Sequence, residues 1–547
     1  MTEQILQFIE RLLLQILMGV SAVVFSFSLS ADDDTATIKH IYDWGDLGTN
    51  YYANPILPSD YSDIDVIRVN GKFYMISSEF HFMGMPVLES DDMINWHIVS
   101  QVYNTMPLEG YYSMEKFGEG TWAPSIRYHN GLYYIYVCTP KEGVFVSTAK
   151  DPHGPWSKIE VVQAAVGWQD PCPYWDASGK AYLIRGIVGG GEIYVHKMSA
   201  DGKKLLDDGV KVYSGPVAQG AKVYHRGRSV YIALSEGGAA TGWLKVLRGS
   251  NILGPFKGKR VFEKGTTSIR GLGEGAFVET ASGDWWYYHF QQIDPQGRIL
   301  HLQPTTWEDG FPLVGKDYDG NGVGEPVARH KKPILNEDVK PCAPQHSDHF
   351  DGPKLGLQWQ SNHNAAVGHI SLWERPGWLM IRSLPSMDLR LSRNQLSQKL
   401  IGYNGRASVI IDKCEMVEGQ RAGMECIGKR YNGAGVYMMK RGKDVVPWVY
   451  FDYQGNVELV AKIPDGCDQV HIKLEIDATE NVFCFYYSFD GKTFKPCGRS
   501  FPQGSADYKG ARIGMYTYST TQESGNAYFD DFTYEIDGPG FLFKKEE

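Results

Sequence analysis

The chain has 547 residues, of which 43% are hydrophobic and 22% charged, and its formal net charge is −10. Its length suits two or more domains with separate cores. The acidic balance and the scatter of Lys and Arg, with no basic run, argue against nucleic-acid binding. The 33 Tyr and 14 Trp residues suit short β-strands, and such flat rings also stack on sugars.

The stretch LLLQILMGVSAVVFSFSLSA (residues 12–31) is apolar, follows Arg11 and is succeeded by three Asp residues. We interpret residues 1–31 as a signal peptide, which predicts an exported protein, periplasmic or extracellular. The apolar run is long, and Glu3 and Glu10 reduce the positive charge in front of it. An uncleaved membrane anchor is therefore the alternative.

The eight cysteines include no C-x-x-C pair, which argues against a zinc ribbon. Export would permit disulfides, with Cys414 and Cys426 as one candidate pair. Their spacing alone assigns no pairing.

Residues 40–330 repeat one pattern five times: a strand, a tight turn that ends in Gly, and an aromatic strand. The hairpins span residues 63–76, 122–137, 170–184, 219–234 and 274–290, and the period is roughly 50 residues. Five such repeats predict an all-β fold that begins with a five-bladed β-propeller of about four strands per blade. Strand pairs between the hairpins fit the outer strands of the blades.

The innermost strand of each propeller blade lines the central axis, so the first residues of the repeats should converge there. They are Asp63, Trp122, Asp170, Gln219 and Glu274. Like charges raise one another's pKa, and Asp and Glu are poor strand formers, so such convergence indicates a functional site. Two carboxyl groups flanking a sugar, one ionised base and one protonated acid, are the apparatus of glycosidic cleavage.

Five stretches resemble glycoside hydrolase family 43, in the family's order: residues 54–83, 120–136, 170–183, 220–227 and 297–315. The resemblance covers residues 45–330. It implies a five-bladed propeller and an inverting enzyme that releases terminal β-D-xylosyl or α-L-arabinofuranosyl residues from plant cell-wall glycans. It also implies that no cofactor takes part in the chemistry.

The resemblance assigns roles to single residues. It implies that Asp63 is the general base and that Asp170 tunes the pKa of the acid and orients it. Asp65, on the same strand face as Asp63, would support the base. Four residues match sugar-contacting positions, and one matches a histidine that in relatives touches a calcium ion or its waters. The first four are Trp122, Phe80, His81 and Phe82, and the last is His301.

The family's general acid is a Glu at the head of the fourth repeat, where this chain has Gln219. Glutamine cannot donate a proton to a leaving oxygen, and the loss of general acid catalysis costs roughly 10²–10⁴-fold. The fifth repeat carries Glu274 where relatives commonly have Gln. Glu274 is therefore the first candidate for a replacement acid, and Glu236 is a weaker one. Two alternatives stay open: Gln219 was introduced to trap a substrate, or the chain binds carbohydrate without cleaving it.

Residues 331–345, with several Pro and Lys, are predicted to be a linker. Residues 346–538 form a second β-rich region that suits a concanavalin-like β-sandwich. It resembles the C-terminal module of family 43 xylosidases and arabinofuranosidases, which in relatives packs on the propeller and can lend a loop to the pocket rim. Asp351, Asp530 and Asp531 are candidate ligands for a structural Ca²⁺.

Overall fold

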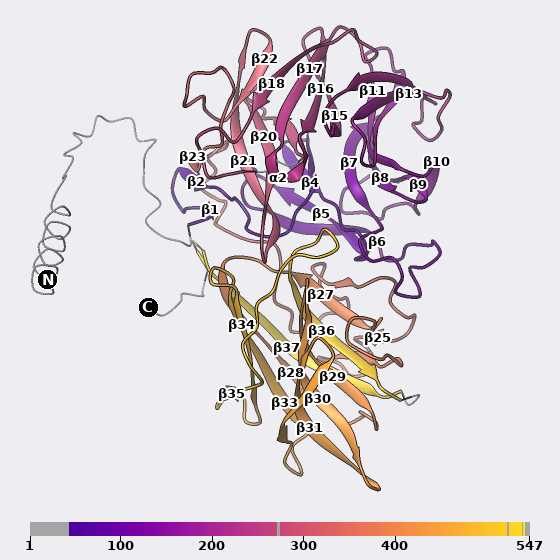
Figure 1. The fold of residues 1–547 in the computed structure, drawn as a ribbon, viewed down its shortest axis with the longest axis vertical. Helices are drawn as coiled ribbons and strands as arrows, with labels where there is room; N and C mark the ends of the chain where they lie inside the picture. The colour runs from indigo at the N-terminus through magenta and orange to yellow at the C-terminus, as the bar shows by residue number, and fades with distance from the viewer. Residues whose placement is uncertain (1–42, 271–273, 522–523, 539, 542–547) are drawn as a thin grey trace, which may run out of the picture. The chain divides into compact units, whose positions relative to one another are not determined.

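The computed structural model describes residues 43–270, 274–521, 524–538 and 540–541 (Figure 1). The predicted signal or anchor lies outside these residues. The described part is built from β-strands and one helical turn, α2 (Gly238–Thr241). None of its helices combines the length and apolar character needed to cross a membrane.

The strands from residue 65 to residue 314 form five four-stranded antiparallel sheets, each made of strands consecutive in sequence. The first contains β3 (Asp65–Val69), β4 (Lys72–Ile76), β5 (Gly84–Ser90) and β6 (His97–Tyr103). The second contains β7 (Trp122–His129), β8 (Leu132–Thr139), β9 (Gly143–Ala149) and β10 (Glu160–Ala164). The third contains β11 (Trp168–Trp175), β12 (Ala181–Ile187), β13 (Glu192–Met198) and β14 (Val210–Ser214). The fourth contains β15 (Gln219–Arg226), β16 (Ser229–Glu236), β17 (Trp243–Gly249) and β18 (Lys257–Phe262). The fifth contains β19 (Ala276–Glu279), β20 (Trp285–Ile293), β21 (Gly297–Glu308) and β22 (Phe311–Val314).

The five predicted hairpins are confirmed as the first two strands of these sheets. All five turn glycines have φ between 60° and 90°, a left-handed conformation that glycine adopts without a steric cost. They are Gly71, Gly131, Gly179, Gly227 and Gly283. Second strands such as β8 and β20 are buried along nearly their whole length, because each of these sheets is covered on both faces.

A small sheet joins the start of the described chain to the end of the repeats. It consists of β1 (Gly45–Asp46), β2 (Tyr51–Ala53) and β23 (Arg329–Lys331). The segment predicted as a linker begins in this sheet and is tied to the first of the five sheets. The Cys342 amide donates to Asn95 Oδ1, and the Gln345 side chain hydrogen-bonds both the amide and the carbonyl of Ile98.

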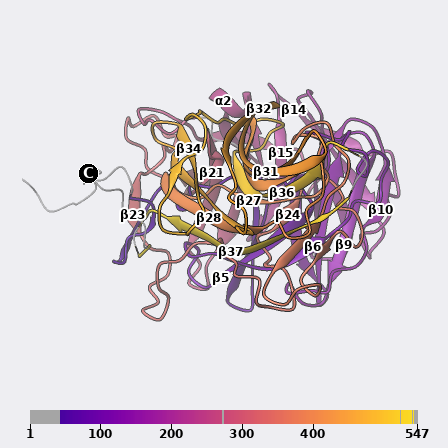
Figure 2. The same ribbon diagram turned by 90° about the horizontal axis from the view of Figure 1, so that it is seen from below.

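The C-terminal region contains two seven-stranded antiparallel sheets (Figure 2). One has the order β24 (Gln360–Ser361), β27 (Gln395–Lys399), β36 (Arg512–Ser519), β29 (Gln420–Ile427), β30 (Tyr431–Arg441), β31 (Asp444–Tyr453) and β32 (Asn456–Lys462). The other has the order β25 (Ile370–Ser371), β26 (Leu379–Arg382), β37 (Asn526–Ile536), β28 (Asn404–Asp412), β33 (Gln469–Asp477), β34 (Val482–Ser488) and β35 (Lys495–Pro496).

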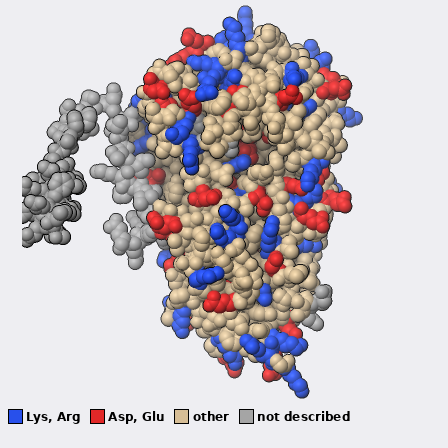
Figure 3. All heavy atoms as spheres, in the orientation of Figure 1, with Lys and Arg blue, Asp and Glu red and all other residues tan. Residues whose placement is uncertain are grey.

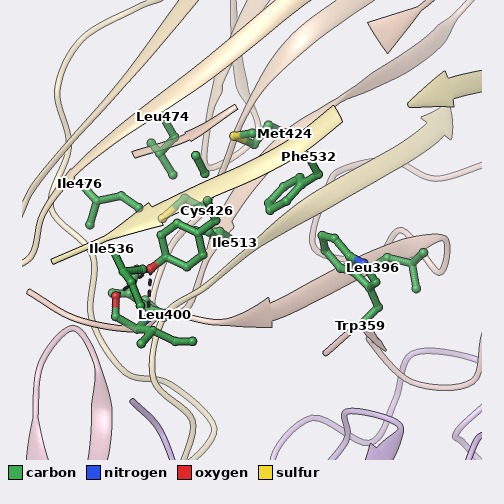
Figure 4. Close-up of a cluster of buried hydrophobic side chains, with 14 of the residues drawn as sticks. Trp359, Leu396, Leu400, Met424, Cys426, Leu474, Ile476, Ile513, Phe532 and Ile536 are labelled. Atoms are coloured by element: carbon green, nitrogen blue, oxygen red, sulfur yellow. Dashed lines mark hydrogen bonds between the residues drawn. The ribbon is translucent and has the colours of Figure 1, made fainter. Parts of the chain in front are cut away.

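These two sheets share one hydrophobic core, part of which is shown in Figure 4. Met424 comes from the first sheet, and Leu474 and Phe532 come from the second. In β33 every second residue is buried, because one face of the strand packs inward and the other faces outward. All eight cysteines lie in the described residues and are free, so Cys414 and Cys426 are not bridged.

The C-terminal region contacts the five-sheet region through buried ion pairs. Lys509 Nζ lies 2.7 Å from Asp60 Oδ2 and donates to the carbonyl oxygen of Ser78 at 3.1 Å. Lys399 Nζ donates to Glu79 Oε1 and, at 2.8 Å, to the carbonyl oxygen of Asp60. Buried charges are tolerated only when they are paired in this way. On the surface shown in Figure 3, basic and acidic side chains are interspersed rather than gathered into a basic band.

Candidate active site

The first strands of the second, third and fourth sheets begin with an irregularity in their pairing. The register shifts between Trp122 and Ser125, between Gln169 and Cys172, and between Gln219 and Lys222. A residue inside each irregular stretch has positive φ: Ala123 (35°), Asp170 (58°) and Gly220 (66°). A bulge of this kind bends a strand and re-aims its side chains, and it is frequent beside active sites. It explains how polar residues at strand starts turn toward a common point.

Asp63 precedes β3 and has a φ of 52°. Its carboxylate forms an ion pair with Arg298, whose Nη1 lies 2.8 Å from Oδ1 and 3.0 Å from Oδ2. The hydroxyl of Ser78 donates to Oδ2 at 2.7 Å. Asp63 is 6% exposed, so these two partners fix the position of a buried carboxylate.

Asp170 and Glu274 lie on either side of Gly220. The Gly220 amide donates to Asp170 Oδ2 at 2.8 Å, and a Cβ atom added to Gly220 would lie 2.4 Å from Glu274 Cγ. Burial raises the pKa of the Asp170 carboxyl to about 7; the nearby Asp63 adds to the rise and the Gly220 amide opposes it. Burial, Asp170 and Asp63 together raise the pKa of Glu274 well above its usual range.

Glu274 has the environment of a carboxyl group that keeps its proton. It is 8% exposed, and its Oε2 atom is buried without a hydrogen-bond partner among the described residues. The charge of Lys222 opposes this rise in the pKa of Glu274. The buried Nζ of Lys222 donates to the Pro124 carbonyl and to Ser125 Oγ. Glu274 thus lies in the field of two other carboxyl groups, Asp63 and Asp170, and of two cations, Lys222 and Arg298.

Gln219 begins β15, where it pairs with Ser235, and it is partly exposed. It directly precedes Gly220, whose amide donates to Asp170 Oδ2. Glu236, the weaker candidate for the acid, is 1% exposed and is committed elsewhere. The Tyr213 hydroxyl donates to one of its oxygens, and the Trp243 indole donates to the other at 3.0 Å.

Three aromatic rings lie together beside this group. Phe80 stacks on Tyr508 with ring centroids 5.4 Å apart, and Trp122 meets both rings edge-on, at 5.8 Å and 5.2 Å. Tyr508 comes from the C-terminal region, in the loop between β35 and β36, and is 53% exposed. Phe80 is 2% exposed, so the rings of this set that stay open to a sugar are the partly buried Trp122 and the half-exposed Tyr508. Phe80 and Trp122 were predicted from the sequence, whereas Tyr508 was not.

The other two predicted sugar-contacting residues are buried to the same degree as Phe80 but have different neighbours. His81 is 2% exposed; its Nδ1 accepts the Gly118 amide at 3.2 Å, and burial lowers its pKa well below the usual range. Phe82 is 3% exposed, and the Arg512 guanidinium lies over its ring at 4.0 Å. The structure places both toward the C-terminal region rather than beside Asp63.

Asp65 is fully buried and supports the second sheet. Its Oδ2 accepts the Ile126 amide at 2.9 Å and forms an ion pair with Arg127. Asp65 therefore fastens β3 to β7 next to Asp63. Arg298 and Lys222 were missed as site residues, although both lie in stretches that carry the family resemblance.

His301, on β21, stacks on His289 of β20 with a centroid distance of 4.9 Å. Burial and His289 lower the pKa of His301 well below its usual range, so its ring is neutral at neutral pH. Neither ring nitrogen has a hydrogen-bond partner among the described residues. Because Ca²⁺ takes oxygen ligands, these nitrogens fit the water shell of an ion better than direct coordination. Asp351, Asp530 and Asp531, the other candidates for calcium, do not converge on a point in the described chain.

Comparisons with known proteins identify the family and the relatives of this chain. Residues 52–312 match the family described as glycosyl hydrolases family 43, and residues 347–535 match the β-xylosidase C-terminal concanavalin A-like domain. A solved structure, the bifunctional GH43-CE protein of Bacteroides eggerthii, superposes with a TM-score of 0.77 at 26% identity. That match covers 89% of this chain and 64% of the other chain, which is less than two thirds of its length.

Three relatives match over most of their length. A protein of Xylanibacter ruminicola, provisionally named as a beta-xylosidase, is 43% identical over 474 residues, which cover 87% of this chain and 88% of the relative. A beta-xylosidase of Formosa agariphila is 35% identical and covers 91% and 92%. The non-reducing end alpha-L-arabinofuranosidase BoGH43B of Bacteroides ovatus is 26% identical and covers 89% and 95%. The chain therefore belongs to family 43 of the glycosyl hydrolases and carries a β-xylosidase-type concanavalin A-like C-terminal domain.

Proposed function

We propose that the protein removes terminal β-D-xylosyl or α-L-arabinofuranosyl residues from plant cell-wall glycans, with inversion at the anomeric carbon and with Glu274 as the general acid. The names of the relatives, two as β-xylosidases and one as an arabinofuranosidase, support these two sugars. Family membership supports a chemistry carried by protein carboxyl groups, with no cofactor in the reaction.

One observation carries the assignment of the acid: Glu274 is buried beside two other carboxyl groups, which raise its pKa. A general acid must hold its proton at the working pH, and burial with neighbouring negative charge produces that state. Gln219 has no proton to give. It can still hydrogen-bond a sugar hydroxyl, since an amide both donates and accepts.

In the proposed reaction Asp63 takes a proton from a water molecule whose oxygen attacks the anomeric carbon. The Glu274 carboxyl gives its proton to the departing glycosidic oxygen, so one carboxyl gains a proton as the other loses one. Arg298 and Ser78 hold the Asp63 carboxylate toward the water. Asp170 acts through Glu274 by raising its pKa.

We further propose that the five four-stranded sheets are the blades of a propeller that spans residues 40–330. In support, β3 packs on β7, β7 on β11, β11 on β15 and β19 on β3. The contact of Gly220 with Glu274 joins the fourth and fifth sheets. Residues 331–345 would then connect it to a sandwich of residues 346–538. Export of the protein is inferred from residues 12–31 alone.

The test compares Glu274→Gln, Gln219→Glu and Glu236→Gln on two substrates: a xylo- or arabino-oligosaccharide and an aryl glycoside with a good leaving group. We expect Glu274→Gln to lose roughly 10²–10⁴-fold in kcat/KM on the oligosaccharide and far less on the aryl glycoside, whose leaving group needs no proton. Glu236→Gln should keep this ratio of substrates unchanged. Full oligosaccharide activity of Glu274→Gln would exclude it as the acid.

Gln219 also favours a second candidate function, the binding of a glycan without cleavage. The same assay distinguishes the two functions. Binding of the oligosaccharide with no turnover of either substrate by the unchanged protein would support the binding function. A gain of turnover in Gln219→Glu alone would show that the fourth-repeat position is where this fold needs its acid. Proton NMR of the first product formed by the active protein would show whether the anomeric configuration is inverted.

A further inference from the structure

A glycine-rich acidic loop follows β22 and lies apart from the carboxyl groups of the active site. Its sequence, KDYDGNGVGE, spans residues 316–325. One carboxylate oxygen each from Asp317, Asp319 and Glu325 lies within 4.8 Å of the other two. This is the one such convergence of three carboxyl, imidazole or thiol groups in the described parts of the chain.

The Asp317 carboxylate organises the loop around itself. Its Oδ1 accepts the amides of Gly320 and Asn321, at 2.8 Å and 3.1 Å, and its Oδ2 accepts the amide of Gly322 at 2.9 Å. Gly320 and Gly322 have φ of 76° and 80°, which lets the chain turn tightly about the carboxylate. A backbone bridge between Lys316 and Glu325 closes the loop.

Glu325 provides an independent indication of a ligand. Its side chain is fully buried, and its Oε2 accepts both the amide and the hydroxyl of Thr266. Its Oε1 is also buried but has no hydrogen-bond partner among the described residues. A Cβ atom at Gly265 would lie 2.2 Å from Glu325 Cδ, so the carboxyl group is packed in place. A buried, unpaired carboxylate oxygen is costly unless something else binds it.

We propose that Asp317, Asp319 and Glu325 bind one Ca²⁺ ion. The three carboxylates are hard oxygen donors, which Ca²⁺ and Mg²⁺ prefer over nitrogen and sulfur. Ca²⁺ accepts six to eight oxygens in a variable geometry, and a loop with partly exposed carboxylates and backbone carbonyls can supply these together with water. Mg²⁺ requires a stricter octahedron and retains most of its water, so it suits this loop less well.

The proposed ion would fasten the fourth sheet to the fifth. Gly324, inside the loop, forms a bridge to Phe262 at the end of β18, and the Glu263 amide donates to the Gly324 carbonyl. Glu325 holds Thr266, which belongs to the segment that leads from β18 toward Glu274. A cation bound between the end of β18 and the loop after β22 would hold the two sheets and this segment together, and it would take no part in the chemistry.

The experiment measures metal binding by the full chain after treatment with a chelator. Isothermal titration with CaCl₂ and with MgCl₂ gives stoichiometry and affinity, and thermal unfolding at each metal concentration gives the stabilisation. Asp317→Asn, Asp319→Asn and Glu325→Gln remove one ligand charge each. Asp309→Asn, in the exposed turn before β22, is the matched control, because its φ of 50° is well tolerated by Asn and its carboxylate is not in the cluster.

We expect one Ca²⁺ per chain, a Tm that rises with Ca²⁺ concentration, and weaker binding of Mg²⁺. Asp319→Asn and Asp317→Asn should weaken Ca²⁺ binding by roughly 10- to 100-fold, while Asp309→Asn leaves it unchanged. The proposal is overturned if the unchanged protein shows neither binding nor a shift in Tm up to about 10 mM Ca²⁺. It is also overturned if Ca²⁺ binds equally well to Asp319→Asn, or if Mg²⁺ binds more tightly than Ca²⁺. If Glu325→Gln fails to fold, the exposed Asp319 variant decides the matter.

Discussion

Replacing Gly220 by Ala should displace Glu274. A Cβ atom at residue 220 would lie 2.4 Å from Glu274 Cγ and 2.7 Å from its Cδ, whereas ordinary carbon contacts are about 3.5 Å or longer. The Glu274 side chain would therefore have to move by about 1 Å, and its burial prevents it from swinging into solvent. A shift of about 1 Å in a reacting group costs roughly 10²-fold in rate. We expect Gly220→Ala to lose about that much kcat/KM on an oligosaccharide.

Gly227→Ala is the matched control for backbone strain. Gly220 and Gly227 have φ of 66° and 60°, but no atom lies within 4 Å of a Cβ added at Gly227. Both variants should lose about 1–2 kcal/mol of stability, because each forces Ala into the left-handed region. Thermal unfolding measures this shared loss. Kinetics on an oligosaccharide and on an activated aryl glycoside measure the additional loss of kcat/KM that is expected for Gly220→Ala alone.

Full activity of Gly220→Ala on the oligosaccharide would contradict the expected displacement of Glu274. A loss of the same factor on both substrates would also contradict it, because a displaced acid matters little to a leaving group that needs no proton.

Three further predictions concern Asp170, the buried ion pair between the two regions, and Tyr508. The pKa of Asp170 is about 7 in the folded protein and about 4 in the unfolded chain. The protonated carboxyl therefore stabilises the fold at low pH, and this stabilisation, on the order of 4 kcal/mol, is lost as the pH rises from about 4 to about 7. Asp170→Asn should therefore be more stable than the unchanged protein at pH 8 but less active, and an unchanged slope of stability against pH from 4 to 7 would contradict this. Lys399→Met should destabilise the protein by about 3–5 kcal/mol, because it leaves Glu79 with one fewer buried cation. A double-mutant cycle with Glu79→Gln in chemical denaturation should show strong coupling, whereas additive effects would argue against the ion pair. Tyr508→Ala should raise KM severalfold and leave the Tm nearly unchanged, because the ring is largely exposed and stacks on Phe80. A large drop in Tm would instead assign Tyr508 a structural role.

The five hairpins could be predicted because a turn glycine and an aromatic strand are local signals, written within about 15 residues of each other. The polar residues at their starts could be predicted for the same reason, since a fixed position in a repeat occupies a fixed position in space. The burial of Glu236 could not, because its partners lie on other strands: Tyr213 on β14 of the third sheet and Trp243 on β17 of the fourth.

Contacts from the C-terminal region were the hardest to foresee. Lys509 donates to the Ser78 carbonyl across 431 positions of sequence, and no periodic pattern encodes that pairing. Tyr508 is next to it and reaches Phe80 and Trp122 by the same loop. The resemblance to family 43 indicated that such a loop could exist, but the residue types alone did not identify which loop.

The buried charges between the two regions constrain how this protein can evolve. Asp60 and Glu79 come from the five-sheet region, and Lys399 and Lys509 come from the C-terminal region. A recombination event that replaced the C-terminal region would leave Asp60 and Glu79 without their cations, and one that replaced the five-sheet region would leave Lys399 and Lys509 without their anions. The two regions should therefore be inherited together, with substitutions at these four positions occurring in compensating pairs. A family tree built from either half should then have the same branching order as a tree built from the other.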